Sequence, residues 1–286
     1  MKKFSFTSAL MHFTRTDGPL SFIWKFIAIY SVALMLIWAV WFIIMAVSIP
    51  TFADSIARTG GFTSTSATDV LAVFSGFILF LVAAGIFETA ALRHYIRREP
   101  FSLKFGKDEL RTFAVFLFWF LMLLAILTGM SMLTVIILPI AGLTPVGVVI
   151  SIVWNIVVFL APGIFGILFS AASSVTFRDE KVRFFKARSA MKGNFWKAAG
   201  AYVVVYVALI IAYILAQLIA MALTGISAGS PAQLLNPVSI IFWVLCAAGL
   251  ASMYAMFHLV TLGIPARAAI AEDGEAQTER TAEVFA

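Results

Sequence analysis

The sequence predicts an all-α membrane protein with six transmembrane helices, because long apolar stretches alternate with short polar gaps along most of its length. An apolar fraction of 62% with only 12% charged residues lies far outside the range of soluble domains. Each stretch is long enough to cross a hydrocarbon core of about 30 Å as a helix that rises about 1.5 Å per residue. The stretches lie at residues 26–49, 70–92, 112–138, 146–169, 198–223 and 238–262.

The first three predicted spans are almost free of charge. The first follows a basic N-terminal arm and precedes the gap 50–69, in which Gly60 and Gly61 begin a hydroxyl-rich turn. The second contains Glu88 close to its C-terminal end, and the third contains no charged residue. Glu88 is therefore the only acidic residue predicted to lie within the membrane-spanning stretches.

The last three spans contain single polar residues and one proline. The fourth carries Asn155 near its middle and Pro162 seven residues later, and proline removes a helical hydrogen bond. The fifth carries Gln217, and the sixth carries His258 and the only cysteine, Cys246. A single cysteine excludes an internal disulfide and a multi-cysteine metal site.

The basic residues indicate the orientation of the chain. All but one of the 20 Lys and Arg residues lie in the N-terminal arm, in the gaps 93–111 and 177–197, or after the sixth span, and the exception is Arg58. Positive loops stay cytoplasmic because translocating them is unfavourable and the inner leaflet is anionic. Both termini are therefore predicted to be cytoplasmic.

The basic segments also contain apolar residues at helical spacing, which predicts short amphipathic helices in the headgroup plane. A helix packed on the neighbouring spans is an equally good interpretation. Phe185 and Trp196 lie off the apolar stripe of the third segment. The stripes are Phe6, Leu10 and Phe13; Leu103, Leu110, Phe113 and Ala114; and Phe184, Ala187, Met191 and Phe195.

The net charge of +6 predicts an anionic partner. Because this charge lies in short loops between spans, the sequence favours anionic phospholipid over nucleic acid, with another membrane protein as a second possible partner. The candidate headgroup-binding residues are Arg183, Lys186, Arg188, Lys192 and Lys197.

The order of segments predicts one membrane domain over residues 1–270, built from three repeats of a short cytoplasmic helix followed by two spans. The repeats would cover 1–92, 93–172 and 173–270, and each second span ends with a Phe followed by a polar residue. Residues 271–286 are acidic and are predicted to form a disordered tail.

Residues 187–197, which read ARSAMKGNFWK, carry a resemblance to a known family. The pattern of a small residue and Ser, then Lys-Gly-x-Phe-Trp just before a span, resembles bacterial multi-pass inner-membrane proteins similar to the membrane domain of glycerophosphodiester phosphodiesterases. The resemblance implies a bacterial inner-membrane location. It implies no reaction, because the phosphodiesterase chemistry of those proteins belongs to a separate soluble domain, for which no segment here is long enough.

Four polar residues at membrane depth are candidates for function, because such residues are costly there. Glu88 either snorkels to the interface or faces the bundle interior as a proton or cation site. In the repeat alignment, Glu88 and His258 lie at similar depth and are predicted to approach one another, which would give a pair able to titrate near neutral pH. Asn155 and Gln217 either hydrogen-bond between helices or line a cavity.

No catalytic, cofactor-binding or metal-binding motif is present, so the sequence predicts no enzyme. The favoured hypothesis is an integral inner-membrane protein that binds anionic lipid or a membrane partner through its basic cytoplasmic helices. A small-solute or lipid transporter is the alternative. An intramembrane enzyme that uses Glu88 or His258 as a base is the least supported, since a lone carboxylate and a distant histidine do not make a mechanism.

Overall fold

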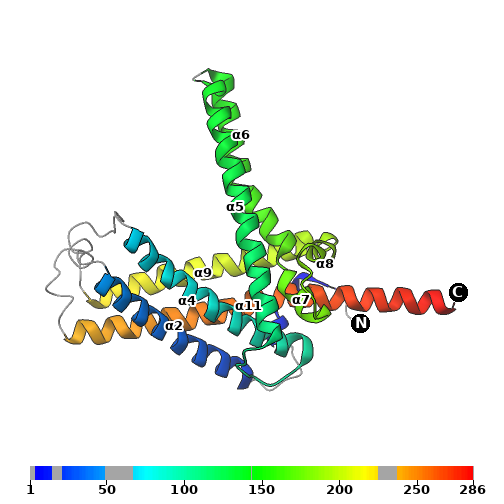
Figure 1. Cartoon of the computed structure of the whole chain (residues 1–286), viewed down its shortest axis with the longest axis horizontal. Helices are drawn as coiled ribbons and strands as arrows, with labels where there is room; N and C mark the ends of the chain where they lie inside the picture. Colours follow the sequence, from blue (N-terminus) through cyan, green and yellow to red (C-terminus); the bar gives the residue numbers. More distant parts are fainter. Residues whose placement is uncertain (1–3, 15–20, 49–66, 143, 225–236, 286) are drawn as a thin grey trace. The chain divides into compact units, whose positions relative to one another are not determined.

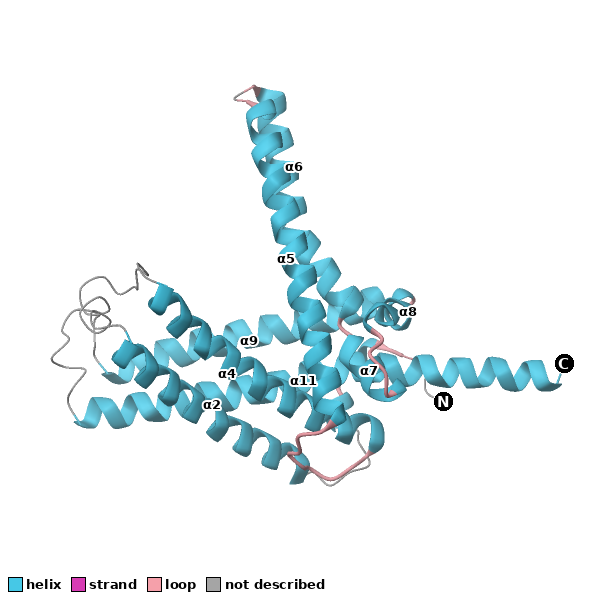
Figure 2. Cartoon of the chain, in the orientation of Figure 1, coloured by secondary structure: helices cyan, strands magenta, loops and turns pink. Residues whose placement is uncertain are grey.

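The described part of the chain is helical throughout, with connecting loops and no strand. The structure is a computed structural model that describes residues 4–14, 21–48, 67–142, 144–224 and 237–285 (Figures 1 and 2). Six of its helices are long and apolar enough to cross a membrane. The protein is therefore an all-α, multi-pass membrane protein, as the sequence predicts.

The helical elements follow the predicted order. The short elements η1 and η3 are 3₁₀ helices, and η2 is a π-helix that continues α4. The elements are α1 (Phe6–Leu10), η1 (His12–Thr14), α2 (Ser21–Ser48), α4 (Ala67–Leu92), η2 (Arg93–Arg97), α5 (Lys107–Ala141), α6 (Pro145–Phe169), α7 (Ala172–Asp179), η3 (Phe184–Lys186), α8 (Ala187–Lys192), α9 (Phe195–Thr224) and α11 (Pro237–Phe285).

The second and fourth spanning helices end in the same way. After α4, η2 is followed by Arg98, and after α6, α7 is followed by Glu180; both of these residues are left-handed, with φ of 59° and 53°. Left-handed residues commonly terminate helices, but they are usually glycine or asparagine. The spacing from Phe87 to Arg98 equals the spacing from Phe169 to Glu180. This agrees with the predicted repeat, in which Phe87 and Phe169 are equivalent positions. The threefold repeat itself stays a prediction.

The second basic segment differs from its predicted form. Residues 99–105 are not helical, and α5 begins directly at Lys107. Pro100 disfavours helix before it, and the Glu109 carboxylate accepts a hydrogen bond of 2.8 Å from the Gly106 N–H at the start of α5. The predicted stripe in 101–114 is therefore wrong as a separate helix, and Leu103 and Leu110 are exposed.

The C-terminal segment also differs from expectation. Residues 271–286 are predicted to be a disordered tail, whereas α11 continues as far as Phe285. Ala, Glu, Gln and Arg dominate this segment, and these residues have high helix propensity. A composition with few large apolar residues disfavours a packed core, but it does not exclude a helix.

The chain divides into two compact units. One comprises Met1–His12, Phe105–Ala201 and Gly263–Ala286, and the other comprises Phe13–Lys104 and Tyr202–Leu262. We call them the α5–α8 unit and the α2–α4 unit after the helices that each contains whole.

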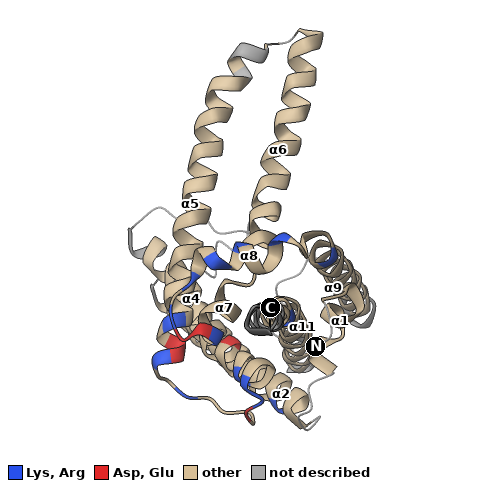
Figure 3. Cartoon of the chain, turned by 90° about the vertical axis from the view of Figure 1, so that its right-hand side faces the viewer, with Lys and Arg blue, Asp and Glu red and all other residues tan. Residues whose placement is uncertain are grey.

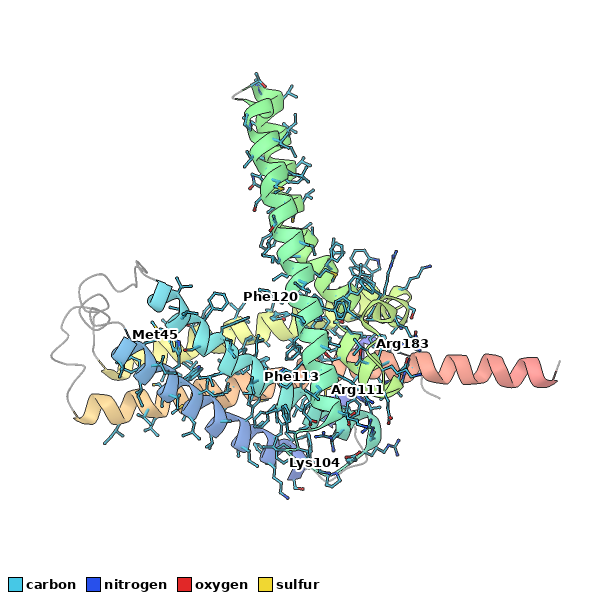
Figure 4. The ribbon with its side chains drawn as sticks, in the orientation of Figure 1. Met45, Lys104, Arg111, Phe113, Phe120 and Arg183 are labelled. Carbon is cyan, nitrogen blue, oxygen red and sulfur yellow. The ribbon has the colours of Figure 1, made fainter. Side chains whose placement is uncertain are left out.

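The α5–α8 unit contains an antiparallel hairpin of α5 and α6 (Figures 1 and 3). Trp154 on α6 donates a hydrogen bond of 2.8 Å to Thr134 on α5. Many large apolar side chains of the hairpin are exposed, such as Phe120, which Figure 4 labels. α7 is the best-buried element here, since all its residues from Ala172 to Phe177 are buried. The exposed apolar side chains of the α5–α6 hairpin form the kind of surface that a helix presents to lipid.

The α2–α4 unit is held together by close packing of its two whole spans. Gly76 on α4 faces the indole ring of Trp41 on α2 so closely that a Cβ atom at Gly76 would overlap the ring. The Trp41 indole N–H also donates to the Ala72 carbonyl, at 3.3 Å. By contrast, among the described residues outside its own helical turn, nothing lies within 4 Å of the position that a Cβ atom would take at Gly163, Gly166 or Gly249.

Candidate functional site

The segment from η3 to the start of α9 packs one side against the spans of its unit. Phe184, Ala187, Ala190 and Met191 are all buried. The Phe184 ring stacks on Phe169, with centroids 5.3 Å apart and planes 11° from parallel, and meets the edge of Trp119 at 5.6 Å. Phe184 thereby fixes this segment on both α5 and α6.

The five predicted headgroup-binding residues are all exposed on this segment. We call them the basic face; Figure 3 shows Lys and Arg in blue on α8 and at the start of α9. They are Arg183, Lys186, Arg188, Lys192 and Lys197.

Two of the five cations already have partners within the α5–α8 unit. The Lys186 ammonium lies 2.9 Å from the Asp179 carboxylate, and the Lys197 ammonium donates to the Phe4 carbonyl at 3.3 Å. The Arg183 backbone N–H donates to Thr176, at 3.0 Å. Within the described ranges, no hydrogen bond or ion pair engages the side chains of Arg183, Arg188 or Lys192.

A polar network anchors the basic face to the neighbouring helices. Arg178 at the end of α7 donates to Asp179 at 2.8 Å, to the Ala269 carbonyl at 2.6 Å and to Glu272 at 3.1 Å. Glu272 in turn accepts a hydrogen bond of 2.6 Å from Ser189 on α8. Charge-assisted hydrogen bonds of this kind are stronger than neutral ones, so α7, α8 and α11 hold one another in place in this unit.

Two aromatic residues complete the exposed side. Phe185 is 69% exposed and Trp196 is 83% exposed, and they lie on either side of Arg188 and Lys192 along the chain. Both aromatics lie off the apolar stripe that the sequence predicts for this segment. The signal in the sequence is that exposed aromatics flank the cations along the chain: Phe185 belongs to η3, Arg188 and Lys192 belong to α8, and Trp196 belongs to α9.

A second polar cluster lies in the α2–α4 unit, at the level of Glu88. Nδ1 of His258 on α11 lies 3.1 Å from the Tyr30 hydroxyl on α2, and the Tyr254 ring meets the Tyr30 ring edge to face, with centroids 6.1 Å apart. Glu88 is buried, at 7% exposure, and lies close enough for its charge to act on both tyrosines. Phe87 stacks on Tyr30, with centroids 4.1 Å apart.

The predicted pairing of Glu88 with His258 is only partly reproduced. Both residues lie in one cluster, as the repeat alignment suggests, and Glu88 faces the interior. The hydrogen bond to His258, however, comes from Tyr30. Sequence reasoning missed Tyr30 because a tyrosine in an apolar span is usually part of the hydrophobic packing.

The other two polar candidates do not join this cluster. Asn155 is exposed, and its amide donates to the Ser151 carbonyl of its own helix at 2.7 Å. Pro162 lies inside α6, which runs unbroken to Phe169. Gln217 is half-buried on α9. Among the residues that the structure describes, neither amide makes the interhelical hydrogen bond that one interpretation of the sequence expects.

The exposed side chains of the basic face are cations, so the ligand that fits this face is an anion rather than a metal ion. Comparisons with protein-family models, with curated proteins and with solved structures find no match for this chain. The class of protein that the fold defines is an all-α, multi-pass membrane protein, and its function has to be argued from these two groups of residues.

Proposed function

We propose that this protein is a non-catalytic integral protein of the bacterial inner membrane that binds anionic phospholipid through the basic face. The observation that carries the proposal is the arrangement of the segment from η3 to α9. Its apolar residues pack on the spans, while Arg183, Arg188 and Lys192 extend outward without a protein counter-ion in the described structure.

The position of the face along the spans supports a lipid ligand. The segment directly follows the fourth candidate span and directly precedes the fifth, so its cations lie where the helices leave the hydrocarbon. Trp is typical of the membrane interface, and Trp196 begins the fifth span. An exposed aromatic between cations suits a surface that meets headgroups and acyl chains together.

The orientation belongs to the same proposal. If the positive gaps are cytoplasmic, both termini and the basic face lie on the side of the membrane where anionic lipid gives the more negative surface. The resemblance of residues 187–197 to bacterial inner-membrane proteins agrees with this location. The alternative partner for the basic face is another membrane protein that carries acidic residues at the same depth in the membrane.

The test replaces Arg183, Lys186, Arg188 and Lys192 together with Gln. Each Lys or Arg near an anionic surface contributes about 1 kcal/mol before screening, so the variant should copurify with clearly less phosphatidylglycerol and cardiolipin than the parent. Added salt should mimic the loss, because the surface potential decays within a Debye length of about 8–10 Å.

A charge-preserving variant is the matched control. Exchanging Arg for Lys and Lys for Arg at the same four positions keeps each charge and should keep the lipid. If the Gln variant is folded and its anionic lipid content, measured by mass spectrometry, equals that of the parent, the proposal is wrong.

The transporter alternative depends on the second cluster. Glu88, Tyr30, Tyr254 and His258 are ionisable or hydroxyl-bearing groups held together at membrane depth, as in proton and cation sites of transporters. Asn155 gives this alternative no support, because it is exposed and bonds to its own helix. We therefore favour lipid binding.

A further inference from the structure

The basic face contains a pair of cations that the protein leaves uncompensated. Arg188 and Lys192 are four residues apart on α8, which places their side chains next to one another. Two like charges at this spacing repel and destabilise a helix. Neither side chain meets an acidic group in the described part of the chain, whereas the nearby Lys186 is neutralised by Asp179.

Four exposed residues, which we call the exposed stripe, continue past the end of α8: Phe185, Arg188, Lys192 and Trp196. Gly193 keeps right-handed helical angles, the Asn194 N–H donates to the Met191 carbonyl at 3.0 Å, and the Ala198 N–H donates to the Asn194 carbonyl at 2.9 Å. The backbone makes a turn at Gly193 and Asn194, between the end of α8 at Lys192 and the start of α9 at Phe195. Trp196, in the first turn of α9, thus comes soon after Lys192 along the chain, and both side chains are exposed.

The stripe has an aromatic residue at each end and two cations between. Phe185 and Trp196 are among the most exposed aromatics of the unit. Exposed aromatic rings favour the boundary between headgroups and acyl chains, and the cations between them lie at the level of the phosphates. A water-soluble phosphate would make no use of the two rings.

Within the lipid-binding function proposed above, we infer that Arg188 and Lys192 form a subsite for a phospholipid with two phosphodiester groups, of the cardiolipin class. One phosphodiester carries one negative charge and compensates one of the two cations. A headgroup with two phosphodiesters compensates both and removes their repulsion. The aromatic ends of the stripe then contact acyl chains on either side.

The experiment measures the preference of the purified full-length protein for cardiolipin over phosphatidylglycerol, in nanodiscs matched for total phosphate. Single variants Arg188→Gln and Lys192→Gln each remove one cation. Lys104→Gln, in the exposed loop before α5, is the matched control for loss of one charge; Figure 4 labels Lys104 and Arg183.

We expect the parent to prefer cardiolipin. Each single variant should lose about fivefold in cardiolipin affinity, which is the factor that corresponds to one surface cation. Binding of phosphatidylglycerol should change little, since one phosphodiester still finds one cation. Lys104→Gln should keep the preference, and inorganic pyrophosphate should fail to displace cardiolipin.

Several results would overturn the inference, and they differ from failure of the proposed function. Equal affinity of the parent for both lipids, or a preference that survives both single variants, removes the two-phosphate subsite and leaves anionic-lipid binding in place. Displacement by pyrophosphate makes the ligand a soluble anion. Absence of any anionic-lipid binding by the parent overturns both proposals.

Discussion

The Tyr30 hydroxyl lies 3.1 Å from Nδ1 of His258, so a hydrogen bond joins α2 to α11 within the α2–α4 unit. Tyr30 is fully buried, with Phe87 stacked on one face of its ring. The Tyr30 ring also meets the Tyr254 ring edge to face, with centroids 6.1 Å apart. One residue of the first span thus organises the polar residues of the last.

Replacing Tyr30 with Phe should destabilise the protein. The change keeps the ring and its packing on Phe87 but leaves His258 without the hydroxyl to which it hydrogen-bonds. Interhelical hydrogen bonds in membranes contribute about 0.6 kcal/mol on average, and stranded buried groups cost about 1–3 kcal/mol, so we expect a loss between these values. Unfolding in detergent measures the loss. Tyr213→Phe, which removes an exposed hydroxyl on α9, should change nothing.

Replacing Glu88 with Gln tests whether its charge matters to the cluster. A snorkelling Glu88 would tolerate the change. Because Glu88 is buried beside Tyr30 and Tyr254, we expect the free energy of unfolding to fall by about 1–3 kcal/mol as the groups around it lose their counterpart. A variant as stable and as abundant as the parent would argue against an interior role for the carboxylate.

Replacing Gly76 with Ala should disturb the packing of α2 on α4. The added Cβ would overlap the Trp41 ring, and overpacking of a well-packed site costs about 1–3 kcal/mol. Gly163→Ala is the matched control in α6, where no neighbour lies within 4 Å, and it should be neutral or slightly stabilising because alanine is the better helix former. Equal stability of the two variants would contradict the close contact.

The predicted orientation can be tested by labelling single cysteines on a Cys246→Ala background. A cysteine at Val146, at the start of α6, should react from the periplasm, and cysteines at Lys107 and Lys192 should react only from the cytoplasm. All three positions are exposed. Periplasmic labelling at Lys192 would overturn the orientation and the cytoplasmic location of the basic face.

The spans were predictable because hydrophobicity over a full membrane thickness is a strong signal that local details do not mask. All six predicted stretches coincide with candidate spanning helices. The ends of the helices were less predictable. The start of α5 depends on Glu109 and Gly106, and the continuation of α11 depends on helix propensity in a polar segment.

The candidate sites were predictable as residue types but not as contacts. The basic face could be listed from charge alone. Two of its cations have protein partners, Asp179 and the Phe4 carbonyl. Neither partner belongs to the apolar stripe of this segment, so the charge pattern could not reveal the contacts. Likewise, the positions of Glu88 and His258 within their spans predicted that the two residues lie at similar depth in the membrane. The hydrogen bond between Tyr30 and His258 depends on the packing of α2, which the sequence does not reveal.

The most direct test of lipid binding at the basic face is photocrosslinking in the membrane. A photoreactive phenylalanine analogue replaces Trp196 in one variant and Phe159 on α6 in another; both native residues are aromatic and 83% exposed. We predict that the adducts at position 196, identified by mass spectrometry, are enriched in anionic phospholipid relative to those at position 159. The same lipid mixture at both positions, or adducts at position 196 with protein alone, would contradict the account.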